Sequence, residues 1–356
     1  MGSLSARRPR PAAPRGPYLW AWSALFLALA AGILLPSCRQ GKPEVHKQTR
    51  LIMDTYVSIT AVGPAARIDK AIGLAFGRLE EINRKFNHLD STSPVFAFNH
   101  GDGPLTDSEL VSIIAGAQAV SEASGGAFDI TVEPLLQLWG FYTRQYAVPS
   151  QAAIDSCLKL VGFRKLLVKD DRVTKLDPRV AIDLGGITKG YALKEAARVL
   201  RANGVDSAVV DAGGDVYAIG KKGNQNWKVG VRNPRGEGII GVAAVSNLAL
   251  VTSGDYERFF YGPDSTRYCH IFDPRTGWPA RGYVSSTVIM RDPVWAPGWS
   301  KVLFILGPEA MALSDKAGGF EALLISDKLV ASMSGGLAHA MKLNLEESGI
   351  EPAKSR

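Results

Sequence analysis

The sequence predicts one α+β domain of mainly antiparallel strands with packed helices, behind an N-terminal export segment. Short apolar segments dominate the chain after residue 160, and the short connections between them favour antiparallel pairing. Segments with helical periodicity interrupt these strands. The apolar fraction of 46% is that of an ordinary globular core, and no internal repeat or clean domain boundary divides it.

The export segment lies at the extreme N-terminus. A start rich in arginine precedes an apolar stretch over residues 19–35, and Cys38 follows in a Leu-Pro-Ser-Cys sequence that resembles a lipobox. We therefore expect a signal peptide over 1–37 and a lipidated N-terminus and linker over 38–47, with Cys38 carrying the lipid. The protein is then expected on the periplasmic side of the bacterial cell envelope, anchored to a membrane. An uncleaved membrane anchor is the alternative, because the apolar stretch is nearly long enough to span a bilayer.

The folded domain is expected over residues 48–345. It begins with a strand predicted over 51–61 and an amphipathic helix with apolar residues from Ile68 to Ile82. A second helix is predicted over 107–123, with Asp107 as its N-cap. Further strands are predicted over 165–169, 172–176, 206–211, 216–219, 227–231, 239–245, 249–252 and 283–290, and further helices over 187–202 and 298–306.

The net charge does not indicate a nucleic-acid partner. Removal of residues 1–37 takes away four arginines and no acidic residue, which lowers the formal net charge from +7 to +3. What remains has no basic stripe. Cys157 and Cys269 remain in an oxidising compartment, where a disulfide is possible, and the sequence leaves their pairing open.

A histidine, an acid and a guanidinium share the segment from His270 to Gly277. If its first residues form a strand, His270 and Phe272 lie on one face, and the turn that follows holds Asp273 and Arg275 beside the histidine. Because a histidine titrates near neutrality, His270 is the candidate general base. An ordinary hairpin tip with a surface histidine is the alternative.

A glycine-rich segment leads into the predicted helix over 187–202. Gly185 and Gly186 leave backbone N–H groups free at the helix entrance, and Lys189 adds a full positive charge, which together outline an anion site. The alternative is a strand-to-helix turn that needs glycine only for its backbone conformation. Neither nucleotide-binding fingerprint fits, because GxGxxG and GxxxxGK[ST] are both absent at this place.

Three other segments combine glycines with polar groups. Asp211 and Asp215 flank a glycine pair, where another backbone or a ligand can approach closely. Residues 251–259 hold hydroxyls, acids, an aromatic ring and an arginine around one glycine. A Ser-Gly-Gly-Ala-Phe-Asp segment ends at Asp129.

In this order and spacing the five segments resemble the ApbE family, the bacterial FAD:protein FMN transferases once called thiamine biosynthesis lipoproteins. The resemblance extends from Met53 to about Ala340. It implies transfer of FMN from FAD, with release of AMP, to a Thr or Ser hydroxyl of an acceptor protein. In this family the acceptor typically belongs to an exported or membrane electron-transfer system, and FAD is the substrate.

The chemistry of the residues fits such a transfer. Phosphoryl transfer needs positioning and neutralisation of the phosphate oxygens, for which Lys189, the N–H groups near Gly186 and Arg258 are suited. His270 is the candidate base for the attacking hydroxyl, and Asp273 either orients it or binds substrate.

The two ends of FAD need ring surfaces and hydrogen-bond acceptors. Tyr256 and Trp139 offer flat surfaces, and Asp211, Asp215 and Glu257 offer acceptors. Each carboxylate could equally serve as a cap or turn acceptor. The residues expected to surround FAD, partly from the resemblance, are Met53, Asp129, Lys189, Asp211, Asp215, Thr252, Ser253, Gly254, Tyr256, Glu257, Arg258, His270 and Ile271.

The chain departs from the family at the metal site. Family members hold Mg²⁺ with an Asp and a Thr that precede an apolar run near the C-terminus, and here Pro297 and Lys301 stand in those places, before the run at 302–307. Proline has no side-chain oxygen and a protonated lysine cannot ligate a hard cation, which leaves the Gly186 carbonyl as the candidate ligand. Lys301 could place its own charge there instead. Two alternative functions follow, a FAD pyrophosphatase and a non-catalytic flavin-binding lipoprotein.

A second departure lies in residues 93–99, where the family has Ser-Glu-x-x-Arg-Leu-Asn. Only Ser93 and Asn99 match, since the Glu and the Arg are absent. A loop expected near the flavin pocket therefore differs from that of the family.

Overall fold

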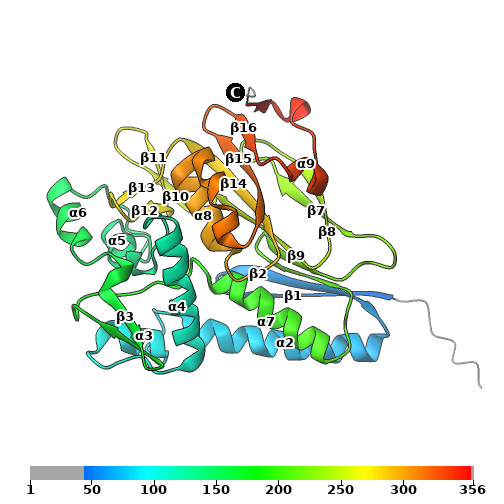
Figure 1. The fold of residues 1–356 in the computed structure, drawn as a ribbon, viewed down its shortest axis with the longest axis horizontal. Helices are drawn as coiled ribbons and strands as arrows, with labels where there is room; N and C mark the ends of the chain where they lie inside the picture. The colour runs from blue at the N-terminus through cyan, green and yellow to red at the C-terminus, as the bar shows by residue number, and fades with distance from the viewer. Residues whose placement is uncertain (1–43, 354–356) are drawn as a thin grey trace, which may run out of the picture. The chain divides into compact units, whose positions relative to one another are not determined.

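The computed structural model describes residues 44–353, and its centre is a nine-stranded sheet (Figure 1). Neighbouring strands pair antiparallel, apart from the parallel pairing of β16 with β18. In spatial order the strands are β1 (Glu44–Ile52), β2 (Thr55–Gly63), β5 (Ala208–Ala212), β6 (Asp215–Ile219), β9 (Leu248–Gly254), β14 (Tyr283–Met290), β15 (Phe320–Ser326), β16 (Val330–Met333) and β18 (Glu351–Pro352). This mixture of helices and mainly antiparallel strands confirms the predicted α+β class.

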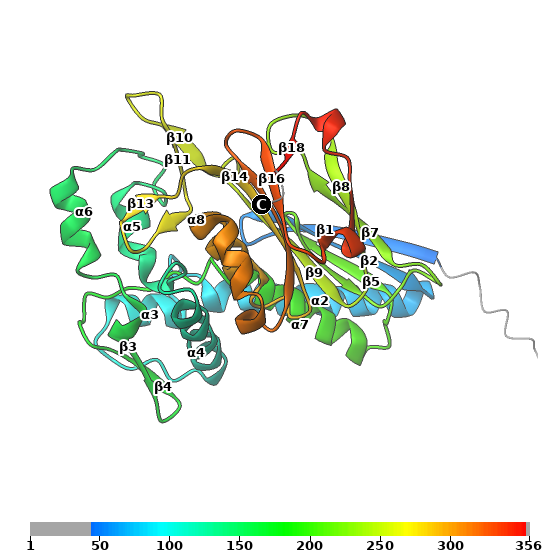
Figure 2. The same ribbon diagram turned by 45° about the horizontal axis from the view of Figure 1, so that its top comes forward.

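Two long helices pack against the first half of the sheet (Figures 1 and 2). α2 (Ala65–Phe86) contacts β1 and β2, α7 (Thr188–Ala202) contacts β5 and β6, and the two helices pack against each other. The helical periodicity predicted for apolar residues is confirmed in α2, because its buried residues recur every three or four positions. A third helix, α8 (Ala296–Leu306), packs on β9 and β14 and touches α7.

A second, three-stranded sheet of β17 (Met341–Leu343), β8 (Ile239–Val245) and β7 (Trp227–Arg232) packs against the nine-stranded sheet. Alternate residues of a strand point to opposite faces, so β14 contributes Val288 to the helix-side core and Ile289 to the core between the sheets. Burial on both faces explains why nearly every residue of β6 and β14 is buried.

Shorter helices and strands lie beside the central sheet (Figure 2), and some of them enclose a separate aromatic core. Trp139, Phe141, Tyr268 and Phe272 pack together there. The helices and strands of this part of the chain are α3 (Pro94–His100), α4 (Ser108–Ala123), α5 (Glu133–Leu138), α6 (Gln151–Leu158), β3 (Leu166–Lys169), β4 (Arg172–Lys175), β10 (Phe259–Tyr261), β11 (Arg267–Cys269), β12 (Phe272–Asp273) and β13 (Trp278–Pro279).

The structure corrects the first predicted strand. Residues 51–61 belong to a hairpin of β1 and β2, because Met53 and Asp54 adopt φ values of 57° and 56° and form a two-residue turn. The second predicted helix is confirmed together with its N-cap, since Asp107 accepts a hydrogen bond from the Leu110 N–H at 3.0 Å. The elements absent from the prediction include helices α3, α5, α6 and α9 (Leu337–Ala340) and strands β10, β11, β13 and β15 to β18.

The predicted signal peptide and Cys38 lie outside the residues that the structure describes. Within residues 44–353, no helix has the length and apolar character needed to cross a membrane. The two cysteines in this range, Cys157 and Cys269, both have free thiols, so they form no disulfide with each other.

Candidate active site

His270 lies at a bend between β11 and β12, so the prediction of one strand that carries His270 and Phe272 on the same face is wrong. The chain bends there because β11 pairs with β10 up to Cys269, whereas Phe272 pairs with Pro279. At the bend the His270 N–H donates to the Arg258 carbonyl at 3.0 Å, and Nδ1 lies 3.2 Å from the same oxygen. A carbonyl oxygen only accepts, so Nδ1 carries the proton and Nε2 keeps its lone pair.

The His270 imidazole is neutral across the physiological pH range. Burial, followed by the positive charges of Arg258, Lys301 and Lys189, lowers its pKa to about 3. A neutral ring with a free Nε2 is the form that accepts a proton from an attacking hydroxyl. An anionic pyrophosphate would offset the same three cations, so we expect bound substrate to raise the pKa of His270 toward its ordinary value.

Asp273 does not orient His270, and that part of the expectation is wrong. The Asp273 carboxylate instead accepts hydrogen bonds from the Arg275 guanidinium at 2.8 and 2.7 Å and from the Arg275 backbone N–H at 3.0 Å. The predicted turn is present, because Gly277 has a φ of 74° and its N–H donates to the Asp273 carbonyl at 2.9 Å. A role of Asp273 in binding substrate stays a prediction.

The glycine-rich segment forms the entrance to α7, and Lys189 lies in the first turn of this helix. Asp183 holds the preceding turn, because its carboxylate accepts hydrogen bonds from the Gly185 N–H at 2.6 Å and from the Tyr142 hydroxyl at 2.7 Å. The N-cap residue Ile187 supplies no side-chain acceptor to the first turn. The Gly185 N–H, expected to be free, is hydrogen-bonded to Asp183, and the Thr188 N–H donates to the Leu184 carbonyl at 2.9 Å. The other first-turn N–H groups and the positive end of the helix dipole are available to an anion.

α8 brings Lys301 to the same place. The Lys301 ammonium donates to the carbonyls of Gly186 at 3.4 Å and Pro297 at 3.3 Å. Burial lowers the pKa of Lys301 to about 8, and Asp215 opposes this shift. Asp215 is itself buried at the start of β6, and burial raises its pKa although Lys189 and Lys301 act in the opposite direction. Two lysines from two helices thus act through their charges on one buried carboxyl group.

Hydroxyl groups hold the sheet to α8 beside these lysines. Ser253 Oγ lies 2.6 Å from Ser300 Oγ, and the Ser300 hydroxyl also contacts the Pro297 carbonyl at 3.0 Å. In the next strand pair, Thr252 Oγ1 lies 2.9 Å from Thr287 Oγ1. Two hydroxyls predicted to surround FAD therefore also make structural contacts within the protein.

Two other predicted FAD contacts have structural roles. Trp139 is fully buried and its indole N–H donates to the Gly277 carbonyl at 3.2 Å, so the prediction that Trp139 offers a flat surface to FAD is wrong. Asp129 is also buried, and it accepts hydrogen bonds from the Thr131 N–H at 2.8 Å, the Thr131 hydroxyl at 2.7 Å and the Phe163 N–H at 2.6 Å. A contact between Asp129 and FAD stays a prediction.

The remaining predicted residues differ in exposure. Asp211 accepts a hydrogen bond from the Gly214 N–H at 2.8 Å. It therefore acts as a turn acceptor, one of the two roles considered for this carboxylate from the sequence. Arg258 is exposed, and its guanidinium donates to the Phe141 carbonyl at 2.6 Å. The others are, from buried to exposed, Gly254 and Ile271, then Met53 and Tyr256, then Glu257.

Three side chains near the α7 entrance are absent from the sequence prediction. Tyr142 binds Asp183, and Glu133 has a pKa that is raised by burial and by the charge of Asp183. The amide of Asn99 contacts both the Ile182 N–H at 2.8 Å and the Ile182 carbonyl at 2.9 Å, which fixes the chain just before the turn. Tyr142 and Glu133 stand in no motif, whereas Asn99 is one of the two family matches in residues 93–99. The structure corrects the expectation of a loop there, because Pro94–His100 form helix α3 with Ser93 as its N-cap.

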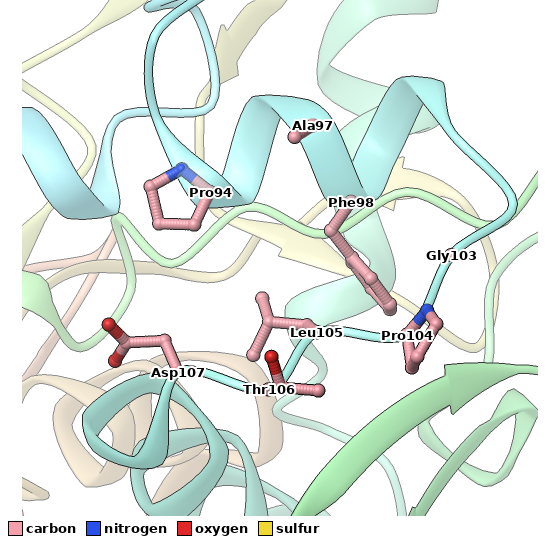
Figure 3. A pocket seen from close by; sticks show the side chains of 8 residues that line it. All are labelled: Pro94, Ala97, Phe98, Gly103, Pro104, Leu105, Thr106 and Asp107. Carbon is pink, nitrogen blue, oxygen red and sulfur yellow. The ribbon is translucent and has the colours of Figure 1, made fainter.

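An open pocket of about 420 Å³ lies between α3 and the chain that enters α4 (Figure 3). No residue predicted for the FAD site lines it. Its acidic group, Asp107, already caps α4 and pairs with Lys85 at 2.8 Å. The lining residues are Pro94, Ala97, Phe98, Gly103, Pro104, Leu105, Thr106 and Asp107.

The residues at the family's metal position do not fit a divalent ion. The carbonyl of Gly186 accepts from the Lys301 ammonium, and Pro297 contributes only its own carbonyl, which the same ammonium contacts. Across residues 44–353, no three His, Cys, Asp or Glu side chains are placed to hold a metal together. Hard cations take oxygen ligands, so an ammonium at this place competes with the ion and does not bind it.

Comparison with known proteins agrees with the predicted family and fold. The sequence model of the ApbE family matches residues 53–324, and the chain belongs to this family. A protein named FAD:protein FMN transferase from Treponema pallidum is 32% identical over 323 residues, which cover 83% of this chain and 89% of the relative. Another of that name, from Vibrio cholerae, is 27% identical, over 82% of this chain and 90% of the relative.

Two solved structures share the fold. The crystal structure of the ApbE protein of Thermotoga maritima is 34% identical, with a TM-score of 0.77, over 83% of this chain and 99% of that chain. The apo form of the flavinyl transferase ApbE of Pseudomonas stutzeri is 28% identical, with a TM-score of 0.74, over 84% of this chain and 98% of that chain.

Proposed function

We propose that this chain is a FAD:protein FMN transferase, which moves FMN from FAD to a Thr or Ser hydroxyl of an acceptor protein and releases AMP. The observation that carries the proposal is His270, a neutral imidazole whose free Nε2 lies within the electrostatic influence of Arg258, Lys301 and Lys189. A base beside converging positive charges suits the attack of a hydroxyl on a pyrophosphate.

In the transfer step, the acceptor hydroxyl oxygen attacks the phosphorus on the FMN side of FAD. A new P–O bond forms to this oxygen, the P–O bond to the bridging oxygen breaks, and AMP leaves with the electron pair. The hydroxyl proton passes to Nε2 of His270. The Nδ1–H of His270 keeps its hydrogen bond to the Arg258 carbonyl, which holds the ring in orientation and stabilises the imidazolium that forms.

Positive groups from two helices stabilise the charge that develops on the phosphate oxygens. Lys189 and the uncapped N–H groups of α7 act from one helix, and Lys301 acts from the other. They are held in place before substrate arrives, by Asp183 at the α7 entrance and by the Ser253 and Ser300 hydroxyls at α8. Preorganised charges of this kind lower a barrier without a reorganisation cost at the moment of reaction.

The protein is further proposed to be a lipoprotein of the cell envelope, with its acceptor in an exported or membrane electron-transfer system. The support is the N-terminal sequence, in which an arginine-rich start and an apolar stretch precede Cys38. Labelling of cells with a radioactive fatty acid tests this proposal. We expect label on the natural chain and none on a Cys38→Ala variant, and equal labelling of both would contradict lipidation at Cys38.

The transferase reaction is tested with the purified full-length chain, FAD and a Thr-containing acceptor peptide, with mass spectrometry of the peptide and chromatography of the nucleotides. We expect one FMN adduct per AMP released. Free FMN and AMP without an adduct would indicate a pyrophosphatase, and FAD that stays bound and intact would indicate a flavin-binding protein. Both of these results would overturn transfer to that peptide.

A further inference from the structure

We propose that the ammonium of Lys301 is a built-in cation of this active site, which replaces a divalent metal ion in binding the pyrophosphate of FAD. The proposal rests on the FAD chemistry proposed above and adds the identity of the cation. It follows that this chain binds and cleaves FAD without added metal.

The position of Lys301 is the first support. Its Nζ donates to the Gly186 carbonyl at the entrance of α7 and to the Pro297 carbonyl one turn earlier in α8. A Cβ on Gly186 would lie 3.0 Å from the Phe128 ring, so the glycine lets this ring pack close to the α7 entrance, and Lys301 Cε is at ordinary contact distance, 4.0 Å, from the same point. The ammonium is therefore directed at backbone oxygens where the entrance of α7 meets the first turns of α8.

The charges around Lys301 are the second support. Asp215 is 6% exposed, and both Lys301 and Lys189 lie near enough to favour its ionised form. Asp183 acts on Lys301 from the α7 side. Lys301 is partly buried and needs such partners, because removing a charge from water carries a desolvation cost. Asp215 and Asp183 together oppose the effect of burial on Lys301, which favours the charged ammonium that an anionic ligand needs.

The donor geometry of an ammonium is the third support. An ammonium has three N–H donors, and Lys301 uses two of them on carbonyls within the protein. The third donor remains for a phosphate oxygen. A lysine binds phosphate as a point charge, so it neutralises one oxygen and does not bridge two as a divalent ion does. Compared with a metal ion, Lys301 does not bridge two phosphate oxygens, but it is covalently part of the chain and cannot dissociate.

The test uses the full-length chain in detergent, stripped of metal with EDTA, and two readouts. One is the Kd of FAD from quenching of flavin fluorescence, and the other is the rate of AMP release with the acceptor peptide. We expect both to differ by less than about 3-fold between EDTA and excess MgCl₂. A loss of 10-fold or more in FAD affinity in EDTA would overturn the proposal.

A Lys301→Met variant keeps most of the apolar stem and removes the charge. We expect its Kd for FAD to rise 10-fold or more and to stay raised in MgCl₂, whereas Lys342→Met, at an exposed lysine of β17, binds FAD like the natural chain. Circular dichroism melts of both variants verify folding. Unchanged FAD binding by a folded Lys301→Met protein would refute the role of Lys301.

The double variant Pro297→Asp with Lys301→Thr supplies two oxygen ligands in place of the cation. We expect its FAD binding to become dependent on MgCl₂. This second variant tests the same role of Lys301 if Lys301→Met fails to fold. A double variant that binds FAD equally well in EDTA would contradict the exchange of cation for metal. Tight, metal-independent FAD binding by a natural chain that transfers nothing would overturn the transferase function and leave the role of Lys301 supported.

Discussion

Substitution of His270 by asparagine separates the two functions of the imidazole. The Nδ2 of asparagine occupies about the place of the histidine Nδ1, so the variant keeps a donor for the Arg258 carbonyl, 3.2 Å away in the natural chain. Nothing in the variant replaces Nε2. Loss of a general base lowers rates by typically ~10²–10⁴-fold, so we expect the transfer rate to fall in this range, which corresponds to about 3–5 kcal/mol in activation free energy.

The assay is single-turnover formation of the FMN adduct, followed by mass spectrometry, with FAD affinity measured in parallel. We expect FAD binding within about 3-fold of that of the natural chain, because the substitution leaves Lys189 and Lys301 in place. His270→Ala also removes the side-chain hydrogen bond to the Arg258 carbonyl, and it serves as the comparison. A rate for His270→Asn within 10-fold of the natural chain would refute the assignment of His270 as the base.

The same substitution has a second readout in the acid stability of the protein. The folded-state pKa of His270, about 3, lies below the value of about 6.5 in an unfolded chain. As the pH falls below 6.5, His270 becomes protonated in the unfolded chain but stays neutral in the folded protein. The free energy of unfolding therefore decreases until about pH 3. At pH 4 the loss is at most about 3 kcal/mol, and His270→Asn should abolish it in urea titrations at pH 4 and 7.

Three further predictions concern the surroundings of the site. Gly190→Ala places a Cβ 2.2 Å from a backbone carbonyl oxygen just before α8. We therefore expect the free energy of unfolding, measured by urea denaturation, to fall by about 1–3 kcal/mol and the transfer rate to decrease. Gly73→Ala, whose Cβ would have nothing within 4 Å, is the control and should raise the free energy of unfolding by about 0.5–1 kcal/mol. Ser300→Ala leaves the buried Ser253 hydroxyl without its partner at 2.6 Å, which should cost about 1–3 kcal/mol in the same assay. Burial raises the pKa of the Cys269 thiol to about 12, so we expect Cys269→Ala to keep the transfer rate within 3-fold, and a complete loss in a folded variant would reveal a covalent role.

The sequence predicts the longest helices and the strands β2 to β9 of this fold because periodicity and capping are local. The helix capped by Asp107 is an example, since its cap and its apolar spacing are written in one short stretch. The first hairpin is not predicted, because Met53 and Asp54 adopt positive φ in its turn. Glycine, the usual residue in such a turn, would have indicated the hairpin in the sequence. The bend at His270 depends on which strands pair on either side of it, and no local pattern records this pairing.

For the active site, the sequence identifies chemical groups but not their partners. Asp273 is paired with Arg275, two residues away, yet the same short segment also allows a contact with His270, and only the structure decides between them. Trp139 looks like a ring available to FAD until the fold buries it among other aromatic side chains. Lys301 and Gly186 lie 115 residues apart, so their contact is invisible to any pattern of spacing.

Pro297 and Lys301 form one unit, which explains why they occur together. Proline is tolerated in the first turn of α8 because its missing N–H is not needed there, and its ring lies against Gly190 of α7. Its carbonyl accepts from the Lys301 ammonium four residues later and from the Ser300 hydroxyl. An aspartate at 297 alone would therefore face the ammonium already at that place and pair with it. Restoring a metal site consequently requires both changes, and Pro297→Asp by itself should leave FAD binding insensitive to Mg²⁺.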